Sequence, residues 1–160
     1  MGKLKPLALV VLALASTWGC AHERLIPGTT VTDTEDNRNL RDIVELYRRR
    51  LLDKDVDGLL VLASERYFED SGTPTATDDY GYQGLKLALT KSLARVKSLR
   101  YDIQYRHMRV EGDRAEVEVF LNGAFELVAE SGEQYRRVSD YHRFVLERAA
   151  SNKWKFLSGM

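Results

Sequence analysis

The chain has 160 residues, which suits one domain once any targeting segment is set aside. Its 44% hydrophobic content and its three prolines are typical of a globular chain and exclude a disordered one. Because 24 basic residues balance 24 acidic ones, charge gives no sign that the chain binds nucleic acid or an anionic membrane surface.

Residues 1–19 have the pattern of a secretory signal peptide. Lys3 and Lys5 come first, the apolar run 7–15 follows, and small residues then lead to a cleavage site. The apolar run is too short to span a bilayer, which needs about 20 residues. We therefore predict that the chain is exported and that residues 1–19 are removed.

Cys20 directly follows this signal, and the chain has no other cysteine. Bacterial lipoprotein signals end in a small residue followed by the cysteine that receives the lipid, and Gly19-Cys20 resembles that ending. Thr17 and Trp18 depart from the usual residues before it, so an ordinary signal peptide remains an alternative. Lipid on Cys20 predicts a membrane-anchored protein of the bacterial cell envelope that faces the periplasm or the exterior.

Residues 20–35 show no periodicity and contain Pro27, Gly28 and a threonine-rich run. Such a composition favours a flexible tether. We therefore expect a tether over 20–35 between the lipid and a single domain that spans residues 36–160.

Helical spacing of apolar residues begins after this tether. The buried face of a first helix is marked by apolar residues at positions 40, 43, 44, 47 and 51. Thr34 or Asp36 is its expected N-cap. The neighbouring arginines 48–50 point in different directions, because successive helical residues lie about 100° apart, so they form no basic patch for nucleic acid.

The segment DKDVDG, 53–58, looks like the opening of a calcium loop, with three alternating aspartates before a glycine. An EF-hand loop closes with a bidentate glutamate, and the closing position here is Ser64. We therefore predict that no calcium binds here. Asp55 or Asp57 instead caps a second helix.

A short extended piece at Tyr67-Phe68 is followed by a break at residues 72–74, which read Gly-Thr-Pro. A third helix is predicted after the break, with Asp78 or Asp79 as its N-cap. Its apolar positions are 82, 85, 89 and 93.

After Arg95 the apolar pattern changes from helical spacing to alternation. Four strands are predicted, at residues 99–110, 115–128, 135–148 and 154–160. The short polar turns between them favour antiparallel hairpins, and helices followed by a strand meander make the class α+β. Trp154 on the last strand is expected to be largely buried.

This layout resembles the nuclear-transport-factor-2-like superfamily, also called SnoaL-like. The segment DKDVDGLLVLASERYFED, 53–70, looks like its second helix and first strand, and RFVLERAASNKWKFLSGM, 143–160, looks like its terminal hairpin. The resemblance implies a cystatin-like cone, in which three N-terminal helices pack on a curved, mostly antiparallel sheet around an apolar cavity. Members include ketosteroid isomerase, dehydratases and polyketide cyclases as well as binding modules without enzymatic activity, so the fold does not set the function.

Asp140 and His142 are the candidate catalytic pair, because residues two apart on a strand share a face. An aspartate can orient a histidine and raise its basicity. Tyr67 or Tyr105 could supply a phenolic donor opposite the pair, and His107 should share a face with Tyr105. The alternative is that Asp140 and His142 only satisfy one another or nearby backbone groups.

No metal and no cofactor are expected, because the sequence contains no metal-ligand spacing and no phosphate-binding glycine loop. Two classes of function remain. One is a lipid-anchored module that binds a small apolar ligand or a protein partner, including a second copy through the sheet, without catalysis. The other is an enzyme of the cyclase, isomerase or dehydratase type that uses Asp140 and His142 inside the cone.

Overall fold

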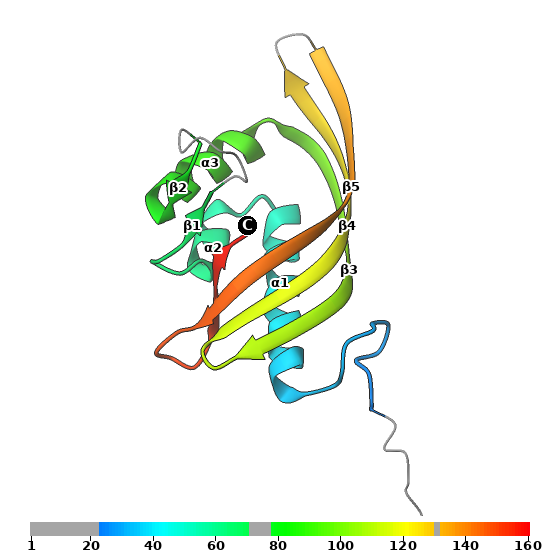
Figure 1. Ribbon diagram of the computed structural model, residues 1–160. Coiled ribbons are helices and arrows are strands. Elements are labelled where there is room, and N and C mark those ends of the chain that lie inside the picture. The colour runs from blue at the N-terminus through cyan, green and yellow to red at the C-terminus, as the bar shows by residue number, and fades with distance from the viewer. Residues whose placement is uncertain (1–22, 71–77, 130–131) are drawn as a thin grey trace, which may run out of the picture.

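The computed structural model describes residues 23–70, 78–129 and 132–160. Cys20, the signal peptide and the break at 72–74 lie outside the described residues. In Figure 1 a curved sheet wraps around helix α1, which confirms the predicted α+β class with its helices on one side of an antiparallel sheet. The elements in chain order are α1 (Glu35–Leu52), α2 (Val56–Leu62), β1 (Phe68–Glu69), β2 (Tyr80–Gly81), α3 (Tyr82–Ala94), β3 (Val96–Glu111), β4 (Arg114–Ala129), β5 (Gly132–Arg148) and β6 (Trp154–Ser158).

Helix α1 begins where the sequence predicted. The Thr34 hydroxyl accepts a hydrogen bond from the backbone N–H of Asn37 at 3.1 Å, so Thr34 is the N-cap. Ile43, which was expected on the buried face, is only partly buried. The buried residues of α1 are Leu40, Val44, Tyr47 and Leu51.

Asp55 is the N-cap of helix α2, as the sequence predicted. Its carboxylate accepts a hydrogen bond from the Gly58 N–H at 2.9 Å and pairs with the Arg50 guanidinium at 2.6 Å. The helix is short and buries three leucines, Leu59, Leu60 and Leu62. The carboxylate that resembled a calcium ligand is therefore engaged in capping and in an ion pair.

The predicted start of helix α3 is wrong. Tyr80–Gly81 forms strand β2, which pairs with β1, and α3 begins only at Tyr82. The N-cap is Gly81, which makes no side-chain capping bond, and not Asp78 or Asp79. The helix starts late because residues 80–81 pair with a strand that lies 12 residues earlier, Phe68 with Gly81 and Glu69 with Tyr80. Local capping preference does not reveal this pairing, because it depends on a distant segment.

The main sheet has the order β3-β4-β5-β6, and all three pairings are antiparallel. Side chains alternate between a concave face, which packs on the helices, and a convex face. A β-bulge interrupts this alternation between Tyr105 and His107. Tyr105 pairs with Val119 and is buried, whereas His107 pairs with Glu118 and is exposed, so the expectation that they share a face is wrong.

The core lies between α1 and the lower half of the sheet, where β6 joins β5. β6 pairs with β5 only over residues 145–148 of β5. Phe144 and Phe156 are fully buried with ring centres 5.5 Å apart, and Tyr47 lies 5.4 Å from Phe144. Trp154 is 4% exposed, which confirms that it is buried.

The chain ahead of α1 packs on the domain over part of the expected tether. Leu25 forms a bridge with Thr32, and between them Ile26 and Val31 are 1% and 4% exposed. The Thr30 hydroxyl also donates to the backbone carbonyl of Arg106 at 2.9 Å. The packed part of the chain therefore begins before residue 36, because two apolar side chains in a polar segment find a place in the core.

Candidate functional site

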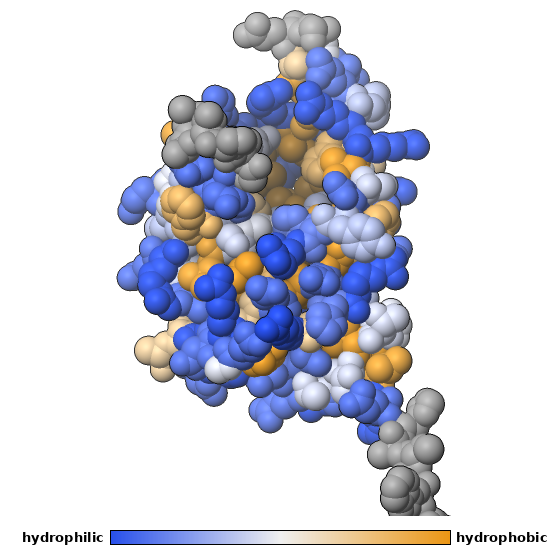
Figure 2. Space-filling model, in the orientation of Figure 1, coloured by the Kyte–Doolittle hydropathy of each residue, from blue (hydrophilic) through white to orange (hydrophobic). Residues whose placement is uncertain are grey.

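A hollow lies on the concave side of the sheet, between α3 and the upper half, where the β4–β5 hairpin extends beyond the helices. Figure 2 shows this hollow with hydrophobic atoms inside it. Val138 faces the hollow by strand alternation and is 45% exposed, so the upper concave face is not filled as the lower one is. The strand register places three rows of concave-face residues here: Leu99, Phe125 and Arg136; Tyr101, Gly123 and Val138; Ile103, Leu121 and Asp140.

Four tyrosines from different segments form a cluster beside the hollow. The Tyr47 and Tyr101 rings lie 6.4 Å apart, and Tyr67 stacks on Tyr80 at 6.4 Å. Burial raises the pKa of Tyr101 to about 12, and burial also raises the pKa values of the other three. The cluster therefore presents neutral phenols, which can donate or accept hydrogen bonds at physiological pH.

A network of hydrogen bonds joins Tyr67 to the last strand. The Tyr67 hydroxyl donates to the Glu69 carboxylate at 3.0 Å and accepts from the Met160 N–H at 3.1 Å. The same Glu69 oxygen accepts from the Gly159 N–H at 2.8 Å. The Gly159 carbonyl in turn accepts from His142 Nε2 at 2.7 Å. Backbone groups of 159–160 thus connect a phenol, a carboxylate and an imidazole.

Gly159 is required at the centre of this network. Its φ of +89° is a conformation that side chains with a Cβ rarely adopt. A Cβ here would also lie 2.5 Å from the Arg143 carbonyl oxygen and 3.2 Å from His142 Nε2. Only glycine therefore brings the backbone this close to the imidazole.

The structure places Asp140 and His142 on the concave side of β5 but does not join them. The Asp140 side chain is exposed and accepts from the Tyr141 N–H at 2.7 Å. His142 is half-buried, packs edge-on against Phe144 at 4.6 Å and donates to Gly159. Neither a hydrogen bond nor an ion pair links Asp140 to His142 among the described contacts. Because a carbonyl can only accept, His142 Nε2 carries the proton and Nδ1 is left as an acceptor.

The two candidate tyrosines have different surroundings. Tyr67 is 2% exposed and belongs to the network with His142. The Tyr105 hydroxyl instead donates to the Glu45 carboxylate of α1 at 2.9 Å, and burial followed by the charge of Glu45 raises its pKa. Tyr105 thus fastens α1 to β3, and the structure brings only Tyr67 close to His142.

Sequence reasoning missed Glu69, Gly159 and Tyr80 as members of this region. Their contacts depend on the pairing of β1 with β2 and on the path of the last residues, and no local pattern signals either. Tyr101 did carry a signal, because it lies on the apolar side of an alternating strand. No group of three or more His, Cys, Asp or Glu side chains able to hold a metal ion occurs within the described ranges.

No protein-family model matches the sequence, and no curated protein matches it. Solved structures do match its fold. A protein from Novosphingobium aromaticivorans, proposed to be an aromatic ring hydroxylase, is 21% identical with a TM-score of 0.64, over 77% of this chain and 85% of that one. A ketosteroid isomerase-like protein from Erwinia carotovora atroseptica is 14% identical with a TM-score of 0.63, over 78% and 93%.

A third similar structure carries the family name. It is a protein of the NTF2-like family from Streptomyces avermitilis, proposed to be a dehydratase, with 15% identity and a TM-score of 0.56 over 77% of this chain and 92% of that one. These likenesses show that the chain has the NTF2-like fold, as the sequence resemblance predicted. At such identities they show the fold and leave the function to be argued from the site.

Proposed function

We propose that this chain is a lipid-anchored protein of the bacterial cell envelope whose NTF2-like domain binds a small apolar ligand in the hollow without transforming it. The observation that carries this proposal is the apolar concave face, left open at Val138 and bordered by neutral tyrosines. Ligand pockets are typically apolar with a few polar groups that fix orientation. Tyr80, the half-buried member of the tyrosine cluster, supplies such a group.

The absence of a ready catalytic pair favours binding over catalysis. The Glu69 carboxylate already accepts hydrogen bonds from Tyr67 and Gly159, and the Asp140 carboxylate accepts one from the neighbouring Tyr141 N–H. The Tyr67 hydroxyl is likewise engaged, with Glu69 and with the Met160 N–H. A ligand with a hydroxyl or carbonyl group on an apolar body matches what remains, which is the half-buried Tyr80 phenol beside apolar side chains.

The test uses Nile red, a neutral hydrophobic dye, and two matched variants of the full chain. Val138→Trp fills the hollow, whereas Val128→Trp makes the same change on the convex face of the same hairpin, where Val128 is 55% exposed. We expect dye fluorescence to saturate with the wild type and Val128→Trp and to be lost with Val138→Trp. Absence of binding, or equal binding by both variants, would contradict the proposal.

Anchoring is a separate part of the proposal and rests on the Gly19-Cys20 junction. None of the helices within the described ranges has the length and apolar character needed to cross a membrane. Replacing Cys20 with alanine should move the protein out of the membrane fraction of cells. A Cys20→Ala chain that stays in that fraction would exclude the lipid as the anchor.

The enzyme alternative is favoured by one observation, the fixed tautomer of His142. With Nε2–H donated to Gly159, Nδ1 can take a proton from a carbon next to a carbonyl, while a tyrosine donates to the carbonyl oxygen. Deuterium exchange at the α-carbons of cyclohexanone in heavy water measures this chemistry directly. Exchange that is faster than in buffer and is lost in His142→Gln would establish the enzyme alternative. Exchange no faster than in buffer would exclude this chemistry and favour binding without catalysis.

The convex face is the surface we propose for a second copy of the chain. The helices of the described residues cover the concave side only, and Tyr141 is 72% exposed on the convex side with its ring 5.2 Å from that of Phe120. An exposed aromatic pair in the middle of a sheet face fits an interface core. Tyr141→Glu should convert a dimer to a monomer in sedimentation analysis, and a wild-type monomer would refute the proposal.

A further inference from the structure

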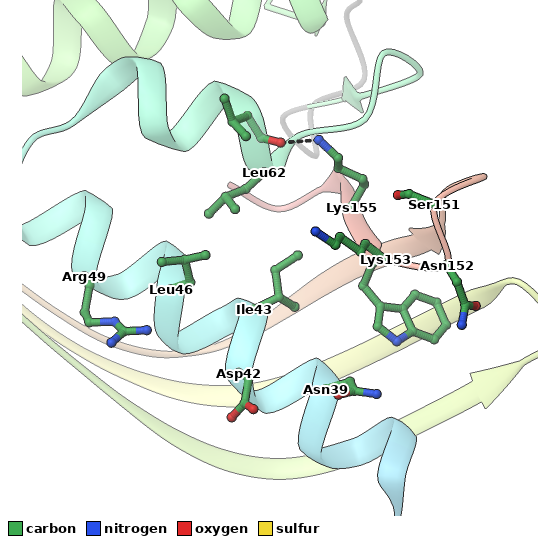
Figure 3. A pocket seen from close by; sticks show the side chains of 12 residues that line it. Asn39, Asp42, Ile43, Leu46, Arg49, Leu62, Ser151, Asn152, Lys153 and Lys155 are labelled. Atoms are coloured by element: carbon green, nitrogen blue, oxygen red, sulfur yellow. Dashed lines mark hydrogen bonds between the residues drawn. The ribbon is translucent and has the colours of Figure 1, made fainter.

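A second cavity lies outside the hollow, on the other side of α1. It has a volume of about 730 Å³ and runs between α1, the end of α2 and the turn between β5 and β6. Figure 3 shows Ile43 and Leu46 of α1 facing Leu62 of α2 and the turn residues across this groove. This size lies within the range of about 300–1,000 Å³ that is usual for small-molecule pockets. The cavity is called the α1 groove below.

The walls of the α1 groove are apolar. Ile43 and Leu46 form the α1 side, Leu62 lies opposite, and the buried ring of Trp154 lies at the turn. Ile43 was expected in the core by its helical spacing, yet it is only partly buried because it faces this groove. An apolar wall on the outer side of α1 gives a ligand with an alkyl or aryl body a place to bury its surface.

The rim of the α1 groove is positively charged. Arg49, Lys153 and Lys155 line it, against the single acid Asp42. Asp42 is already paired with Arg41 at 2.6 Å, and the Lys155 ammonium donates to the Val61 carbonyl. In contrast, neither Arg49 nor Lys153 makes an ion pair with any described residue.

The Lys153 side chain also points into the α1 groove. In Figure 3 its side chain extends from the β5–β6 turn towards Ile43 and Leu46, and Arg49 lies further along α1. A cation held over apolar side chains attracts an anion whose apolar part lies against them. The groove thus combines an apolar wall with uncompensated positive charge, although the whole chain has a formal charge of zero.

We propose that the α1 groove binds an amphipathic carboxylate, with its apolar body against Ile43, Leu46 and Leu62 and its carboxylate near Lys153 and Arg49. This site is separate from the hollow on the concave face and takes a charged ligand, whereas the hollow takes a neutral one.

The experiment follows the indole N–H signal of Trp154 by NMR in the full chain. Trp18→Phe leaves Trp154 as the one tryptophan, because the sequence has two. The probes are octanoate, its neutral counterpart 1-octanol, and acetate, which has the charge without the chain. We expect octanoate to shift the Trp154 signal saturably, and octanol and acetate to bind at least about tenfold more weakly.

Charge is tested by Arg49→Gln combined with Lys153→Gln, which should weaken octanoate binding about tenfold. The matched control is Arg100→Gln combined with Arg137→Gln, which removes two exposed cations from the convex face and should change nothing. Equal binding of octanoate and octanol, or unchanged binding after the first pair of substitutions, would overturn the proposal.

Val138→Trp separates this proposal from the function proposed for the hollow. It should leave the octanoate-induced shift of Trp154 unchanged, because Val138 lies on the concave face and the α1 groove on the opposite side of α1. Loss of the shift in Val138→Trp would place octanoate in the hollow and overturn the second site. Absence of any shift with octanoate would overturn it as well, whatever the result with Nile red.

Discussion

The concave face of strand β5 is buried in the lower half of the sheet and open in the upper half, although the same alternation of side chains runs through both. In the lower half Phe144 and Leu146 are fully buried, whereas in the upper half Val138, on the same face of the strand, is 45% exposed. The difference comes from length. α1 has 18 residues and spans about 27 Å at 1.5 Å per residue, while β4, with 16 residues, spans about 53 Å at 3.3 Å per residue. A helix half as long as the sheet can cover only half of it, so the lower half holds the core and the upper half is left open, where we propose that a ligand binds.

The largest expected effect comes from the lower half. Trp154→Ala removes a side chain that is 4% exposed and carries the Arg148 guanidinium 4.3 Å above its ring. We expect the free energy of unfolding to fall by about 3–5 kcal/mol in urea denaturation followed by circular dichroism. Val138→Ala, a truncation on the concave face of the upper half where the side chain is 45% exposed, should cost well under about 1 kcal/mol. Similar costs for both would remove the distinction between the halves.

The next effect concerns pH at the boundary between the halves, where Tyr101 lies. Its folded pKa of about 12 is above the ordinary value of 10 because of burial. The unfolded chain therefore loses this proton first as the pH rises, so the stability from keeping the phenol neutral is complete below pH 10 and is lost up to about pH 12. Tyr101→Phe should flatten this fall in stability by a few kcal/mol, measured by denaturation at pH 9 and pH 12.

A smaller effect is expected where the last residues join the halves. Gly159→Ala forces a Cβ at φ +89° to within 2.5 Å of the Arg143 carbonyl oxygen. The cost should be about 1–3 kcal/mol in the free energy of unfolding. Gly112→Ala is the control, because Gly112 also has a positive φ of +58° but nothing within 4 Å of the added Cβ. If the two variants lose equal stability, backbone conformation alone explains the effect and the contact with Arg143 does not.

The smallest effect is the loss of one hydroxyl. Tyr67→Phe removes the hydrogen bonds to Glu69 and to the Met160 N–H, which should cost about 0.5–1.5 kcal/mol. Tyr135→Phe, whose exposed hydroxyl bonds to Glu126 at 3.3 Å, should cost almost nothing. Calorimetric melting of the two variants measures the difference, and a neutral Tyr67→Phe would show that the network contributes no net stability.

The sequence predicted the class of fold, the α1 and α2 caps and the buried Trp154, because these depend on patterns within one element. It did not show that Asp140 would be exposed while Leu121, its partner in the next strand, is buried. Alternation says which face a residue shares, but coverage of that face depends on how far a helix reaches. The contacts of Gly159 depend on where the chain passes after its last strand, and no spacing along the sequence records that.

The restricted pairing of β6 has a consequence for how two chains can meet edge to edge. Since β6 joins β5 only over residues 145–148, the described part of β5 ahead of it offers backbone N–H and C=O groups to a further strand. Three arginines, 136, 137 and 143, stand along that segment and are all exposed. Exposed charged side chains of this kind disfavour strand-by-strand aggregation at the open edge, because a further strand would have to cover and desolvate them.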